Sequence, residues 1–136
     1  MSLFKVFDIA GSGMSAQSVR LNTTASNLAN ANSVSTTPEQ AYRARQPVFQ
    51  TALERAAGSQ AAGVRVLGVT ESPAPPLQVF DPGNPLADEQ GYVFKSNVNI
   101  AEEMANMISA SRSFQNNIEV LNTSKELMLR TLNLGR

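Results

Sequence analysis

The side chains best suited to catalysis are scarce in this sequence. Histidine and cysteine are both absent, which removes the most common general base and the thiol nucleophile. Glu102 and Glu103 are the only adjacent carboxylates in a segment with helical periodicity. Neighbouring residues on a helix point about 100° apart, so these two groups cannot converge on one substrate bond. We interpret them as residues that favour a helix N-terminus, where the helix dipole stabilises negative charge.

Two other patterns could carry chemistry, and both are too weak. Gly11-Ser12-Gly13 is too short for a phosphate-binding loop and lacks the lysine of such a loop. Asp81 and Asp88–Glu89 do not have the spacing of a calcium loop. Without cysteine the chain has no disulfide and no thiolate metal site. We therefore predict a protein that is not an enzyme and that has no cofactor.

The charge balance also narrows the choice of partners. Lysine plus arginine equals aspartate plus glutamate, at 11 each, so nothing favours nucleic acid or an anionic membrane surface. No apolar run approaches the ~20 residues that span a bilayer, which predicts no direct membrane insertion. Asp8 interrupts the apolar residues at the N-terminus, and a secretory signal would have an unbroken apolar stretch there. We expect the N-terminus to be kept.

Both ends of the chain carry large apolar residues at intervals of seven. A repeat of seven keeps an apolar stripe on one side of a helix, where a second helix can cover it. All seven prolines lie between Pro38 and Pro85, so neither end is interrupted. We predict that the repeating and flanking residues form helix and subunit interfaces. They are Phe7, Met14, Leu21 and Leu28 in the first segment, and Ile100, Met104, Met107, Phe114, Ile118, Leu121, Met128 and Leu132 in the second.

These patterns predict a mainly α fold with a small β insert. Residues 1–32 form an N-terminal helix, residues 33–97 a Pro/Gly-rich insert, and residues 98–136 a C-terminal helix that Asn99 can cap. The two long helices pair as an antiparallel coiled coil. Gly11 and Gly13 leave two alternatives open: a bent or frayed first turn, or a place where another helix approaches closely.

The insert shows partial alternation of apolar and polar residues, which indicates short strands. Candidate strands are Tyr42–Thr51, with Tyr42, Ala44 and Val48 on one face, Val64–Thr70 with a bulge at Gly68, Leu77–Phe80 and Tyr92–Lys95. Ser33–Pro38 has the composition of a loop. We expect a small antiparallel hairpin or sheet that projects from the helices.

Two motifs resemble a known family. Residues 25–33 (ASNLANANS) are similar to the SNLANANT signature of flagellar rod and hook proteins. Residues 97–117 (NVNIAEEMANMISASRSFQNN), followed by EVLNTSKELM and TLNLG, resemble the C-terminal helix of that family, and specifically of its C-type proximal rod proteins. The motif residues that we single out are Asn27, Leu28, Ala29, Asn30, Glu103, Met104, Arg112 and Asn122.

The resemblance implies a structural subunit of the proximal rod of the bacterial flagellar basal body. Such subunits assemble through their terminal helices into a helical tube that serves motility. The implied partners are B-type and F-type proximal rod subunits, the export-gate adaptor at the rod base, and the type III export apparatus during secretion. The implied location is the periplasmic rod, reached without cleavage of a signal peptide.

Two alternatives remain from the sequence. The first is another flagellar axial subunit of the distal-rod type, although distal subunits carry a much larger insert than residues 33–97. The second is a soluble helical-hairpin adaptor or export chaperone. A cytoplasmic chaperone is expected to have an acidic, highly charged helix surface, and the two terminal segments here are poor in charge.

Overall fold

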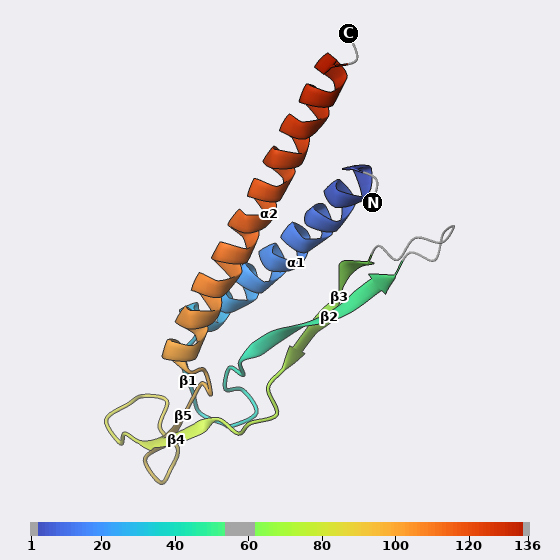
Figure 1. Cartoon of the computed structure of the whole chain (residues 1–136). Coiled ribbons are helices and arrows are strands. Elements are labelled where there is room, and N and C mark those ends of the chain that lie inside the picture. Colours follow the sequence, from blue (N-terminus) through green and yellow to red (C-terminus); the bar gives the residue numbers. More distant parts are fainter. Residues whose placement is uncertain (1–2, 54–61, 135–136) are drawn as a thin grey trace.

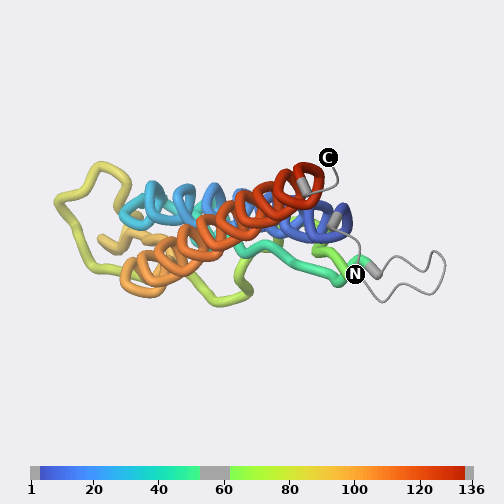
Figure 2. Tube along the Cα trace, turned by 45° about the horizontal axis from the view of Figure 1, so that its top comes forward, coloured from blue at the N-terminus to red at the C-terminus, as the bar shows by residue number. Residues whose placement is uncertain are grey.

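The computed structural model describes residues 3–53 and 62–134, and two long helices dominate it (Figure 1). Helix α1 spans Leu3–Ala29 and helix α2 spans Ile100–Leu134. They run antiparallel and pack against each other, with the first turn of α1 and the last turn of α2 toward the same end of the molecule (Figures 1 and 2). Together they make up about half of the chain. The predicted fold class, mainly α with two paired terminal helices and a small β region between them, is confirmed.

Asparagine side chains mark the junctions between the helices and the insert. After α1, the Asn30 side chain donates to the carbonyl of Ser26 at 2.8 Å, and the Ser33 hydroxyl donates to the carbonyl of Asn30 at 2.7 Å. Before α2, the Asn99 side-chain oxygen accepts from the backbone N–H of Ala101 at 3.1 Å. These bonds satisfy groups that helix ends leave unpaired. The predicted cap at Asn99 is therefore present.

In its described residues, the insert forms two separate antiparallel sheets. Strands β1 (Val34–Ser35), β4 (Leu77–Phe80) and β5 (Tyr92–Lys95) make a three-stranded sheet in the order β1-β5-β4. Strands β2 (Arg45–Leu53) and β3 (Ala62–Glu71) make a two-stranded hairpin. The strands predicted at 77–80 and 92–95 have the predicted bounds. Strand β1 was missed because two residues are too few to alternate.

The β2–β3 hairpin differs in detail from the prediction. Strand β2 begins at Arg45, so Tyr42 and Ala44 precede it and do not share a strand face with Val48. The register shifts between Val48, which pairs with Gly68, and Phe49, which pairs with Val66. Leu67 is thus the extra residue of the bulge, and the prediction that placed the bulge at Gly68 was wrong by one position.

The hairpin lies along α1 instead of projecting freely, which is also a correction. Both β2 and β3 pack against α1, on the side away from α2 (Figure 1). The Ser12 hydroxyl accepts from the backbone N–H of Val64 at 3.1 Å. A Cβ added at Gly63 would lie 2.9 Å from that hydroxyl, so the strand approaches the helix closely. Helix α1 is consequently the middle layer between α2 and the hairpin.

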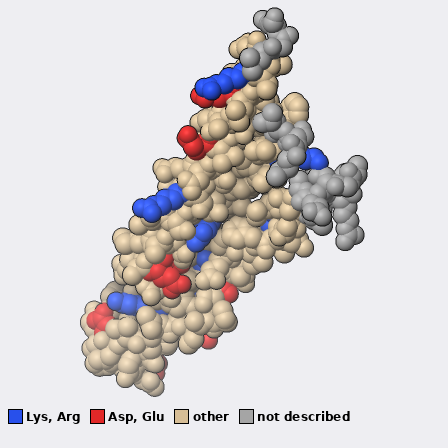
Figure 3. All heavy atoms as spheres, viewed as in Figure 1, with Lys and Arg blue, Asp and Glu red and all other residues tan. Residues whose placement is uncertain are grey.

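The buried apolar core is small. One cluster, at the base of the two helices, joins Ala31, Ala44 and Val98, with Tyr42 packed against it. Val93 of β5 is also buried. In the ranges 3–53 and 62–134, no helix is long and apolar enough to cross a membrane. Figure 3 shows that charged side chains of both signs are spread thinly over the face in view.

Candidate assembly interface and the junction that supports it

Small and polar side chains make the contact between α1 and α2. On α2 the most buried positions recur every seven residues, at Glu103, Ala110 and Ser124, and Ala110 is fully buried. The half-buried Asn117 occupies the remaining place in this series, and a Cβ added at Gly13 would lie 2.9 Å from its side-chain nitrogen. Arg20 of α1 donates to the side-chain oxygen of Asn106 at 2.9 Å. Small residues therefore allow the two helices to approach closely.

This contact bears on the two alternatives for the glycines near the N-terminus. Helix α1 runs without interruption through Gly11 and Gly13. Gly13 faces Asn117 of α2 at short range, whereas a Cβ at Gly11 would meet nothing within 4 Å. Close approach of a helix thus accounts for Gly13 and does not account for Gly11.

The large apolar residues predicted at interfaces lie beside this contact or outside it. Eight are half-buried: Phe7, Met14, Leu21, Leu28, Met107, Phe114, Leu121 and Met128. Four are exposed, with exposed fractions of 41% for Ile100, 55% for Met104, 38% for Ile118 and 70% for Leu132.

Several exposed apolar residues of α2 share one side of the helix. Met104, Ile108, Ile118 and Leu129 lie 4, 8, 18 and 29 residues after Ile100. At 3.6 residues per turn these positions fall within a narrow arc next to the buried face. We call these five residues the α2 stripe. All five are exposed, so the described part of the chain leaves these apolar side chains uncovered. The exposed polar residues Gln115, Asn122 and Glu126 lie in the same arc between them.

Asn27 joins α1 to the start of β2. Its side chain is 1% exposed. The amide nitrogen donates to the carbonyl of Arg45 at 2.8 Å, and the amide oxygen accepts from the N–H of Arg45 at 2.9 Å. That oxygen also accepts from the Tyr42 hydroxyl at 3.0 Å, and the same hydroxyl lies 3.2 Å from the hydroxyl of Ser26. The side chain thus acts as a strand partner for one residue of the insert.

Asn97 makes an equivalent connection from the other side. Its side-chain oxygen accepts from the N–H of Ala44 at 2.7 Å, and its nitrogen donates to the carbonyl of Ala74 at 2.7 Å. The carbonyl of Ala44 accepts from the N–H of Ser72 at 2.7 Å. Two adjacent residues, Ala44 and Arg45, are therefore held by side chains from the ends of both helical segments. We call this arrangement the asparagine junction.

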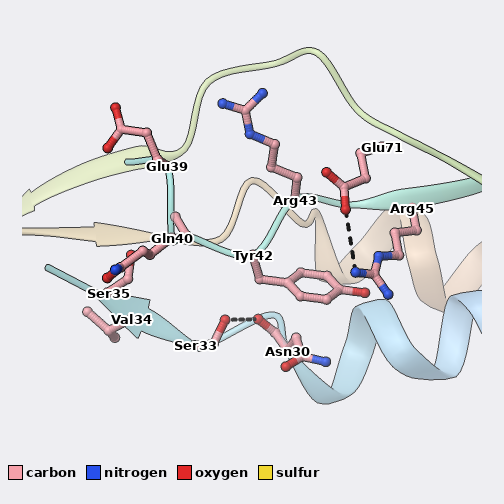
Figure 4. Close-up of a pocket in the computed structure, with 11 residues that line it drawn as sticks. Asn30, Ser33, Val34, Ser35, Glu39, Gln40, Tyr42, Arg43, Arg45 and Glu71 are labelled. Atoms are coloured by element: carbon pink, nitrogen blue, oxygen red, sulfur yellow. Dashed lines mark hydrogen bonds and ion pairs between the residues drawn. The ribbon is translucent and has the colours of Figure 1, made fainter. Parts of the chain in front are cut away.

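A polar cavity of about 410 Å³ opens beside the junction (Figure 4). The Tyr42 side chain extends toward Arg45, whose guanidinium lies 5.5 Å from the ring centroid and 3.4 Å from the Glu71 carboxylate. The Tyr42 hydroxyl is already hydrogen-bonded to Asn27. The cavity has the chemistry of a polar contact surface and offers no activated nucleophile. In the described ranges no group of three acidic side chains could hold a metal ion.

The motif residues fall in different environments. Asn27 and Glu103 are buried, and Leu28 and Asn30 are half-buried. Ala29, Met104, Arg112 and Asn122 are exposed. The structure brings Asn27 and Asn30 to the junction and places Glu103 against α1, but it gives the exposed motif residues no contact in the subunit that identifies a role.

The sequence reasoning missed the roles of three residues in this region. Tyr42 holds the junction through its hydrogen bond to Asn27, and Asn97 holds it through hydrogen bonds to backbone groups. A single hydrogen bond between distant residues produces no repeating pattern in the sequence. Glu103 was interpreted by its place in the first helical turn. Its seven-residue spacing to Ala110 was the available signal, but the small size of Ala110 and Ser124 concealed the pattern.

The comparisons with known proteins agree along the whole chain. The family described as "Flagella basal body rod protein" matches residues 7–35, and the one described as "Flagellar basal body rod FlgEFG protein C-terminal" matches residues 89–134. Proteins named "Flagellar basal-body rod protein FlgC" from Yersinia enterocolitica and Salmonella typhimurium are 58% and 57% identical over 136 residues, covering 100% of both chains. A protein of the same name from Buchnera aphidicola subsp. Acyrthosiphon pisum is 45% identical over 137 residues, with 99% of each chain covered.

Proposed function

The chain belongs to the FlgC family of flagellar basal-body rod proteins, and from that membership we propose that it occupies the proximal rod and stacks there through its terminal helices. It is a structural subunit of the rod and not an enzyme, and it assembles with other rod proteins. Its finer place follows from the resemblance of residues 97–135 to the C-type proximal rod proteins. The neighbours we propose are the B-type and F-type proximal subunits and the export-gate adaptor at the rod base.

The observation that carries the stacking proposal is the α2 stripe. Met104 and Ile108 are 55% and 57% exposed. Burying an apolar side chain of this size contributes roughly 1.5–3 kcal/mol. Apolar side chains that recur at helical spacing can pack into a groove between two neighbouring helices. The half-buried Met107 and Phe114 border the stripe and would complete that contact.

Export is the other part of the proposal. We propose that the subunit reaches the periplasm through the type III export apparatus and keeps its N-terminus. Residues that a cleaved leader would remove are used in the fold here: Ser12 binds the backbone of Val64, and Gly13 packs closely against Asn117. Loss of the first turns of α1 would therefore remove the middle layer of the subunit at one end.

The test of stacking compares two aspartate substitutions on α2 in a strain whose own copy of the gene is deleted. Met104→Asp places a charge in the stripe, and a buried unpaired charge costs several kcal/mol. Ser109→Asp adds the same charge at an exposed position on another side of the helix. We expect Met104→Asp cells to make the protein but to lack rods in electron micrographs and to be non-motile, while Ser109→Asp cells swim.

Normal swimming of the Met104→Asp strain would show that the stripe does not meet a partner. A photo-reactive amino acid at position 104 identifies the neighbours. Adducts with B-type or F-type subunits support the proximal position, and adducts only with distal subunits contradict it.

A further inference from the structure

Glu103 has an environment unlike that of the other charged residues. Within 3–53 and 62–134 it is the one charged side chain that is buried, with 5% of its surface exposed. In the same ranges its carboxylate takes part in neither of the two ion pairs, Arg45–Glu71 and Glu126–Arg130. Its backbone N–H bonds to the carbonyl of Asn99 at 3.0 Å, as expected in a first helical turn. The backbone of Glu103 is thus satisfied, while its charge has no partner in the described chain.

The Glu103 side chain lines a cavity of about 310 Å³. Three elements form the walls: α1 through Arg20, α2 through Glu103 and Asn106, and β2 through Gln46. A water molecule occupies about 30 Å³ in the liquid, so the cavity has room for the head of a long side chain together with some water. It is a pocket with a buried acid in its wall.

The lining of this cavity is formally neutral, and the group becomes negative only when the carboxylate that is paired with Arg45 is counted with it. The lining contains two guanidinium groups, Arg20 and Arg45, and two carboxylates, Glu102 and Glu103. Arg45 is also paired with a third carboxylate, Glu71, at 3.4 Å. With Glu71 included, the group carries one net negative charge. One additional cation would neutralise it.

Glu103 is buried as a residue, but its carboxylate borders the cavity, where water can solvate it until a cation arrives. A well-placed cation would then add a charge-assisted hydrogen bond to it. A metal ion is a poor candidate, because the described residues contain no group of three ligating side chains. A rod subunit is, however, surrounded by other subunits once it is assembled.

We propose that the cavity at Glu103 receives a lysine or arginine side chain of a neighbouring rod subunit, which pairs with the Glu103 carboxylate on assembly. This inference rests on the proposed function. In this proposal the cavity selects between possible partners, which the α2 stripe does not do. Apolar stripes discriminate weakly between partners, whereas a buried acid rejects a neighbour that brings no cation.

The first experiment compares Glu103→Gln with Glu119→Gln. Both remove one negative charge without changing shape, but Glu119 is an exposed residue of α2 that does not line the cavity. We expect Glu103→Gln to lower the number of rods per cell at least ~tenfold, because the incoming cation is then left buried and unpaired, and Glu119→Gln to stay within about twofold of wild type. The thermal midpoint of the purified Glu103→Gln chain should equal or exceed that of wild type, since no internal pair is lost.

A second experiment identifies the partner. A photo-reactive amino acid at Gln46, in the wall of the cavity, should form an adduct with another rod subunit at a peptide that contains lysine or arginine. Reversing that residue to glutamate should abolish rods, and combining it with Glu103→Lys should restore them.

Two results would overturn the inference. Rods in normal number from Glu103→Gln would show that the carboxylate is not needed. A lower thermal midpoint of purified Glu103→Gln would show that Glu103 is neutralised inside the subunit, with Arg20 as the available cation. Either result leaves the rod assignment intact if Met104→Asp still abolishes rods, whereas rods from both variants would count against the assembly proposal itself.

Discussion

Replacing Asn27 by alanine should destabilise the subunit more than any other single truncation of an α1 side chain to alanine. The substitution removes three hydrogen bonds at once: two to the backbone of Arg45, at 2.8 and 2.9 Å, and one from the Tyr42 hydroxyl at 3.0 Å. It leaves the carbonyl and the N–H of Arg45 without these partners, while the Tyr42 hydroxyl keeps its contact with the Ser26 hydroxyl at 3.2 Å. Because Asn27 is 1% exposed, water does not reach its own side chain in the closed junction.

The expected cost follows from the number of bonds. Each intramolecular hydrogen bond contributes about 1 kcal/mol net, and a donor or acceptor left buried costs about 1–3 kcal/mol. Arg45 is itself an exposed residue, so water can reach part of its backbone, and the lower figure applies to each bond. We expect a loss of about 3 kcal/mol in the free energy of unfolding, which is roughly a hundredfold in the folding equilibrium.

Urea unfolding of the purified chain, followed by circular dichroism, measures this loss. Asn22→Ala is the matched control, because Asn22 is an exposed asparagine on the same helix; it should change the free energy of unfolding by less than about 0.5 kcal/mol. Tyr42→Phe should lose about 1 kcal/mol, since it removes the hydroxyl alone. If Asn27→Ala unfolds at the same urea concentration as Asn22→Ala, the junction does not stabilise the fold and our reasoning is wrong.

Two further predictions concern α1. Gly11→Ala should raise the free energy of unfolding by about 1 kcal/mol through helix propensity, while Gly13→Ala should gain less because its Cβ would lie 2.9 Å from the Asn117 side chain; equal gains in urea unfolding would mean that the helices are not in close contact at Gly13. Intact mass spectrometry of the subunit from isolated basal bodies should give the mass of a chain that retains residues 3–29, and a mass lacking part of that range would disprove export without cleavage.

The elements with a repeating pattern were predictable from the sequence. Both long helices follow from the heptads and from the restriction of proline to residues 38–85. Strands β4 and β5 follow from short apolar alternation between turn residues. In each case the pattern depends on residues close together in the chain, which sequence reasoning can weigh directly.

The position of the hairpin and the junction were not predictable in the same way. The hairpin lies along α1 through a serine hydroxyl that bonds to Val64 and a glycine, Gly63, that permits the approach. Asn27 was recognised only as part of a motif, and its role depends on Arg45, 18 residues away. A contact that one polar side chain makes with a distant residue does not appear as a repeating pattern in the sequence.

The heptad interpretation identified the apolar residues of both helices but could not tell which surface they serve. The facing sides of α1 and α2 contain Gly13, Ala110 and Asn117, so the subunit closes its own helical pair with small side chains. Leu132 and the α2 stripe are left exposed as a result. A chain that buried these residues within itself would gain stability as a monomer and would lose the apolar area that draws subunits together. The weak internal core and the exposed stripe thus have one cause: small side chains fill the contact between the helices, and large apolar ones stay on the surface. This arrangement suits a protein whose stable state is the assembled rod.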